Sequence, residues 1–217
     1  MKPEALIWDI PTRFVHWAMV ALFALSWWSA ENRHMDLHYQ SGIAWLALLT
    51  FRLLWGVVGS STARFARFVR GPGAVLAHLR MSGEKHVGHS PIGALSVIAM
   101  LFALTFQILS GLFATDIDGL DSGPLSFLIS FDEARLAAKI HAFSFNALLA
   151  LVCLHLAAIT FYLAVKRRNL VAPMLSGRSG TIPDGQEQMA PASLLRFVIA
   201  CLIAAALAWA VSRGFGL

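Results

Sequence analysis

Residues 140–165 read IHAFSFNALLALVCLHLAAITFYLAV, without a charged side chain between Lys139 and Lys166. A helix that crosses the hydrocarbon core of a bilayer needs about 20 mostly apolar residues, and this stretch exceeds that length. Because lipid offers no partner to free backbone groups, such a stretch must be helical. It also contains His141 and His155, and ionisable residues inside a span are costly and usually functional.

These two histidines are predicted to project from nearly the same face of their helix. At about 100° per residue, the fourteen steps between them come within roughly 40° of four full turns. At a rise of 1.5 Å per residue, they lie about 21 Å apart along the axis. We therefore expect one helix to present an imidazole near each face of the membrane.

Four further apolar stretches accompany this one, and charged residues mark their ends. In total, spans are expected at about 14–32, 38–59, 91–114, 136–165 and 192–213. The chain is 58% hydrophobic and 13% charged, whereas soluble domains carry about 25% charged residues. The predicted fold is all-α: an integral membrane four-helix bundle over residues 1–178, then a linker and one additional C-terminal transmembrane helix within 179–217.

The loop charges predict the orientation of the bundle. Basic residues gather in the 64–89 loop and after Lys166, whereas the 116–139 loop is mainly acidic. Positively charged loops stay in the cytoplasm, so the N-terminus is expected to be cytoplasmic and the C-terminus to face outward. With this distribution, the net charge of +5 reflects membrane topology and not nucleic-acid binding.

Two more histidines match the first two in depth. His16 and His155 both lie near the cytoplasmic face, and His38 and His141 both lie near the outer face. Two bis-histidine sites, stacked across the membrane, are therefore predicted. A pair of axial imidazoles suits haem iron and favours electron transfer, because it leaves no position open for O₂. The sequence lacks a Cys-x-x-Cys-His motif, so the haem would be held without a covalent bond.

Other interpretations of these histidines remain open. Any one of them could be a hydrogen-bonded packing residue, and zinc is a competing ion, although it needs three or four ligands at one depth. His34, one turn before His38, is the credible substitute as outer ligand. A solvated surface role is expected for the remaining histidines of the basic loop, His78, His86 and His89.

Several other residues fit around such haems. Arg13 lies one turn before His16, and Arg52 is predicted at the inner level, so both could pair with haem propionates; alternatively, Arg52 extends to the cytoplasmic interface. Gly42, four residues after His38, would leave one porphyrin face clear. Gly111 could admit the edge of the outer haem or serve only in helix packing.

Several segments carry a family resemblance. Residues 8–17 read WDIPTRFVHW and residues 51–56 read FRLLWG. Together with His38, Gly42 and the fourth span with its continuation to Gly177, they resemble the bacterial cytochrome b561 family over roughly residues 7–178. That family includes the b-type cytochrome subunits of membrane-bound nickel–iron hydrogenases and is similar to the gamma subunit of formate dehydrogenase. The resemblance implies two haems b on the same four histidines, quinone as a redox partner, and a bacterial inner membrane location.

The expected function is transmembrane electron transfer between a quinone pool and an outer-face redox partner, such as a cytochrome c or a dehydrogenase or hydrogenase subunit. Whether the chain is itself an enzyme stays open. One alternative is a stand-alone quinone-linked oxidoreductase that oxidises superoxide, and another is a non-catalytic anchor for a peripheral dehydrogenase. The sequence does not single out a quinone pocket among its aromatic candidates, Trp17, Trp27, Trp28, Trp45 and Trp55.

Overall fold

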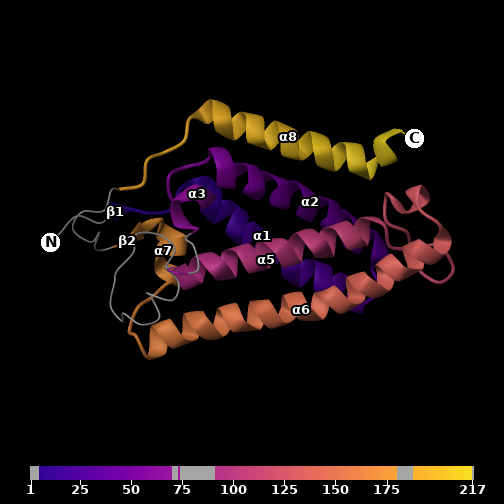
Figure 1. Cartoon of the computed structure of the whole chain (residues 1–217), viewed down its shortest axis with the longest axis horizontal. Helices are drawn as coiled ribbons and strands as arrows, with labels where there is room; N and C mark the ends of the chain where they lie inside the picture. The colour runs from indigo at the N-terminus through magenta and orange to yellow at the C-terminus, as the bar shows by residue number, and fades with distance from the viewer. Residues whose placement is uncertain (1–4, 70–72, 74–90, 180–187, 217) are drawn as a thin grey trace.

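The computed structural model describes residues 5–69, 73, 91–179 and 188–216. The long helices of this part follow the predicted order and run roughly along a common axis (Figure 1). They are α1 (Ile10–Glu31), α2 (Met35–Val58), α5 (Pro91–Leu112), α6 (Phe131–Ala164) and α8 (Leu194–Ser212). Shorter elements are β1 (Ala5–Leu6), α3 (Phe65–Phe68), η1 (Ser126–Leu128), α7 (Val171–Ser176), β2 (Arg178–Ser179) and η2 (Gly214–Gly216). Most of the basic loop, with His78, His86 and His89, lies outside the described residues.

Within the described residues, four helices are long and apolar enough to cross a membrane: Met35–Val58, Ile92–Leu112, Phe131–Ala164 and Leu194–Ser212. The prediction of a helical membrane bundle is therefore confirmed. The first predicted span, 14–32, is also a long helix, α1, but it is not among these four. The helix contains Trp17, Trp27, Trp28 and His16, whose rings are less hydrophobic than aliphatic side chains.

The two ends of the bundle are distinct (Figure 1). The end at which α1 begins also holds α7 and the two-stranded sheet, and we call it the N-terminal end. There β1 pairs antiparallel with β2, and the Gly177 carbonyl accepts hydrogen bonds from the backbone N–H groups of Ile7 and Trp8. The opposite end, at which α8 finishes, is called the C-terminal end. Since α6 runs back from the C-terminal end, the segment after it, which contains α7 and β2, lies beside the start of α1.

A buried carboxylate fixes the start of α1. Asp9 is the N-cap, and its Oδ1 accepts a hydrogen bond of 2.8 Å from the backbone N–H of Thr12. Its Oδ2 accepts a 2.9 Å bond from the indole Nε1–H of Trp55 on α2. Asp9 therefore joins α1 to α2 at the N-terminal end of the bundle.

The last helix, α8, packs along the outside of α2 through small residues. Ala200, Ala204, Ala208 and Val211 are buried at helical spacing, as expected where small side chains let two helices approach closely. The opposite side of α8 exposes large apolar side chains, including Leu194, Leu202 and Trp209. A helix with one packed face and one apolar exposed face is typical of the rim of a membrane bundle.

The helix that carries His141 and His155 has few helical neighbours. A capping box formed by Ser130 and Glu133 starts α6, five residues before the predicted span. The helix packs closely along α5 but approaches α1 and α2 at few points. One bridge is the stacking of Phe145 on Phe23 of α1, with ring centres 5.9 Å apart. The structure thus leaves space between α6 and the α1–α2 pair. His141 of α6 and His38 of α2 approach each other across this space.

Candidate cofactor site

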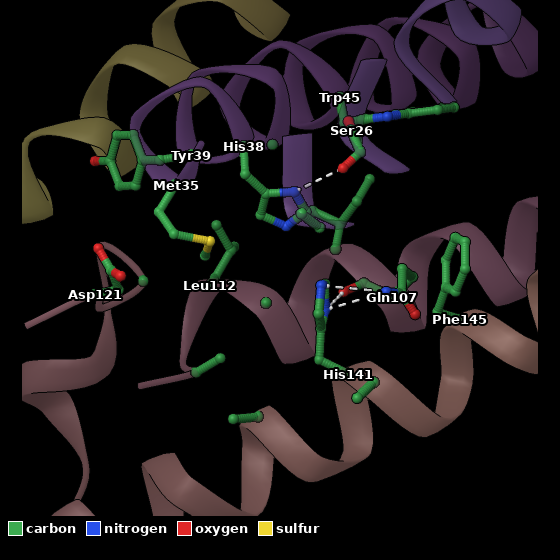
Figure 2. A pocket seen from close by; sticks show the side chains of 18 of the residues that line it. Ser26, Met35, His38, Tyr39, Trp45, Gln107, Leu112, Asp121, His141 and Phe145 are labelled. Carbon is green, nitrogen blue, oxygen red and sulfur yellow. Dashed lines mark hydrogen bonds between the residues drawn. The ribbon is translucent and has the colours of Figure 1, made fainter. Parts of the chain in front are cut away.

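The two histidines predicted for the outer level face one another across this space. His38 of α2 and His141 of α6 have ring centres 6.1 Å apart, with ring planes at 84°. Figure 2 shows both rings directed toward each other from opposite helices. With metal–nitrogen bonds of about 2 Å to each imidazole, two opposed ring centres lie roughly 6 Å apart. The spacing of the two rings therefore suits axial ligation of one metal.

Hydrogen bonding fixes the tautomer of His38. Its Nδ1 lies 2.9 Å from the backbone carbonyl oxygen of Ser26 on α1. Because a carbonyl can only accept, Nδ1 carries the proton and Nε2 keeps its lone pair for a metal. The Ser26 hydroxyl in turn donates to Ser41, whose own hydroxyl donates to the His38 carbonyl. This loop of contacts ties the His38 turn of α2 to α1.

A different helix, α5, holds His141 in the same tautomer. The Nδ1–H of His141 donates to the backbone carbonyl of Gln107 at 2.8 Å, which again leaves Nε2 without a proton. A Cβ on Gly111 would lie 2.7 Å from Cε1 of the same ring. Gly111 therefore makes room for the His141 imidazole, and because it also lines the cavity around His141, its contact with a haem edge stays a prediction.

A cavity of about 920 Å³ surrounds the two histidines. Cofactor cavities typically measure about 300–1,000 Å³ and are mostly apolar with a few polar groups. The lining includes Trp45, Leu112 and Phe145 (Figure 2). It also includes Gly42, where an added Cβ would meet no atom within 4 Å. The glycine thus faces open space, as a porphyrin plane beside His38 would require.

The geometry discriminates between the alternatives left by the sequence. Among the described residues, His, Cys, Asp and Glu do not form a group of three or more that could hold a metal ion, which disfavours zinc. His34 is exposed, stacks on Trp28 with ring centres 5.1 Å apart, and does not line the cavity. His38 is therefore the better candidate for the outer ligand. Haem b fits this donor set, because two imidazoles and a large apolar cavity are what it needs.

The predicted inner histidines come together at the other end of the bundle. His16 of α1 lies within electrostatic reach of both His155 of α6 and Arg52 of α2. Both histidines are partly buried. α1, α2 and α6 thus each bring one of these side chains toward a candidate second site at the N-terminal end of the bundle.

Two arginines near this second site have unsatisfied nitrogens. Arg52 is only 8% exposed, lies over the ring of Phe65 at 5.2 Å, and has a buried Nη1 without a hydrogen-bond partner. Arg13 donates from Nη1 to the Leu175 carbonyl, while its Nε is buried without a partner. A buried guanidinium nitrogen without an acceptor is costly, so a haem propionate would satisfy both side chains. The burial of Arg52 argues against its extension to the interface.

Sequence reasoning did not identify the residues that orient the ligands. Ser26 acts through its backbone carbonyl, which carries no side-chain signal. Gln107 has a signal, because it is the one polar amide in the apolar run of α5, but its contact with His141 depends on how α5 and α6 pack.

The fold defines a multi-pass helical membrane protein, and its cavity brings His38 and His141 close together. The family comparison agrees: the model described as prokaryotic cytochrome b561 matches residues 7–177. The chain therefore belongs to the prokaryotic cytochrome b561 family, which confirms the resemblance seen in the sequence. Membership implies transmembrane electron transfer with b-type haem in a bacterial membrane. Comparison with curated proteins and with solved structures found no match.

Proposed function

We propose that the chain conducts electrons across the bacterial inner membrane through two stacked b haems, between a quinone pool and a redox protein at the outer face. His16 and His155 would hold the inner haem, and His38 and His141 the outer one. The observation that carries the proposal is the outer pair, whose rings face one another with both Nδ1 protons committed to carbonyls. When bound, haem b supplies one-electron oxidation and reduction at its iron.

The continuity of α6 supports two sites at different depths. His141 and His155 lie on one uninterrupted helix, which separates them by about 21 Å along its axis. Their proposed partners are His38, near the start of α2, and His16, near the start of α1. Because α1 and α2 run in opposite directions, these two starts lie at opposite ends of the bundle. In the proposal, the four side chains would thereby supply one pair at each end of the bundle.

The proposed orientation places the N-terminal end in the cytoplasm. At that end α6 is followed by Lys166, Arg167 and Arg168. At the other end, the segment before α6 contains Asp116, Asp118 and Asp121. This asymmetry agrees with the preference of basic loops for the cytoplasm, and it supports α8 as a fifth span that ends at the outer face.

Four other residues have supporting roles in the proposal. Arg13 and Arg52 would bind propionates of the inner haem through their unpartnered nitrogens. Gly42 leaves the outer cavity open beside His38, and Gly111 seats the His141 ring. The outer-face partner would be a cytochrome c or a dehydrogenase or hydrogenase subunit, as the family resemblance suggests.

The test uses the protein purified from membranes that were supplied with ample haem. Haem quantification and absorbance spectra should give two low-spin b haems per chain. In liposomes, a quinol should reduce both haems, and an oxidant confined to the outer side should reoxidise them. One haem or none in the wild type would overturn the proposal. If His16→Ala and His141→Ala leave electron flow and assembly with partners unchanged, the chain is an anchor; rapid haem reduction by superoxide alone would instead indicate a superoxide oxidase.

A further inference from the structure

Helix α5 contributes no haem ligand to the proposed sites, yet its residue Gln107 makes several contacts with the proposed ligand His141. The amide Nε2 of Gln107 lies 3.3 Å from Nδ1 and 3.2 Å from Nε2 of His141. The backbone carbonyl of the same residue accepts the Nδ1 proton at 2.8 Å. Gln107 therefore touches the His141 ring through both its main chain and its side chain (Figure 2).

The near-equal distances locate the amide relative to the ring. An amide nitrogen equally far from Nδ1 and Nε2 in the ring plane would collide with Cε1, which lies between them. The amide must therefore lie against a face of the imidazole. In this position the in-plane lone pair of Nε2 stays available to a metal, and the amide restricts rotation of the ring.

The Gln107 amide is itself held in place. Its Oε1 accepts a hydrogen bond from the hydroxyl of Ser144, three residues after His141 on α6. In this arrangement the N–H end of the amide is directed toward the ring, where an amide oxygen would instead be repelled by the lone pair of His141 Nε2. On the Nδ1 side, the Ser110 hydroxyl lies 3.4 Å from that nitrogen, and Gly111 leaves space for the ring edge. α5 thus forms a cradle around one imidazole.

We propose that Gln107 is a positioning residue that fixes the plane of the His141 imidazole and raises the reduction potential of the outer haem. The inference rests on the proposed ligation of that haem by His38 and His141. Groups that orient a metal ligand tune the metal even though they do not touch it. The N–H end of the amide is the positive end of its dipole, and a positive end beside the ligand favours the reduced iron, which carries less positive charge.

The experiment compares Gln107→Leu with wild type in the purified holoprotein, with Gln40→Leu as matched control. Gln40 lies on α2, is exposed and does not line the cavity. Gln107→Leu should keep both haems and shift the outer-haem equilibrium about tenfold toward the oxidised form, which is about 59 mV for one electron. The electron paramagnetic resonance signal of the outer low-spin haem should change as well. The inner haem serves as the internal reference, and Gln40→Leu should shift neither haem.

Ser144→Ala provides a second test should Gln107→Leu not assemble. It leaves Gln107 in place but frees its amide, so the outer haem should shift in the same direction by a smaller amount. An unchanged outer-haem potential and spectrum in the variants that assemble would overturn the role of Gln107. The proposed function fails separately, because a wild-type protein without two haems would refute that function whatever Gln107 does.

Discussion

Gly42 offers the sharpest test of the outer cavity as a haem site, through the variant Gly42→Leu. An added Cβ at this position meets no atom within 4 Å, and the residue lines the cavity beside His38. The polypeptide alone therefore leaves room for a Cβ, and the cavity offers space for the atoms beyond it. Replacing a helical glycine should even favour the helix, by up to about 1 kcal/mol. The leucine would occupy the space that a porphyrin needs.

The expected result is a monodisperse protein that retains the inner haem and loses most of the outer one, so that the haem content per chain falls to about half. Haem quantification, redox titration and size-exclusion chromatography measure these three properties. Gln40→Leu adds the same side chain on the same helix but on an exposed position, and it should keep both haems. If Gly42→Leu keeps two haems with unchanged potentials, the cavity does not hold the outer haem and the reasoning is refuted.

Three further substitutions test other parts of the structure. His155→Ala should remove the inner haem and spare much of the outer one in redox-resolved spectra, and loss of the outer haem alone would contradict the pairing. Arg52→Gln removes a buried positive charge beside His16. A redox titration should therefore show the inner-haem potential lowered by about 59 mV or more, which is a tenfold change in the equilibrium constant. An unchanged potential would exclude the propionate contact. Asp9→Ala removes the cap of α1 and the acceptor of the Trp55 indole. Thermal unfolding should show that the free energy of unfolding falls by about 2–3 kcal/mol, which is more than for Ser193→Ala at the exposed cap of α8. Equal losses would contradict a bridging role for Asp9.

The helices and the position of each histidine along its helix could be predicted from the sequence because both depend on local patterns. Uncharged runs determine where spans lie, and helical rise determines how far apart His141 and His155 are. The early start of α6 had a readable signal as well, since Ser130 followed by Glu133 is a capping box.

The surroundings of the ligands could not be predicted, because they depend on how the helices rotate and pack. The sequence left open whether Gly111 admits a haem edge or packs a helix, and the structure places the His141 ring against it. Likewise, the choice between His34 and His38 depends on which turn of α2 faces α6. The unpartnered nitrogens of Arg52 and Arg13 become visible only once the residues around them are known.

Locating the irons in the purified holoprotein, by cryo-electron microscopy or by anomalous diffraction at the iron edge, tests the central claim most directly. The account predicts one iron between His38 and His141 near the end of the bundle where α8 finishes, and a second between His16 and His155 near the opposite end. An iron bound to any other pair of side chains, or a single iron in protein made with ample haem, would contradict it.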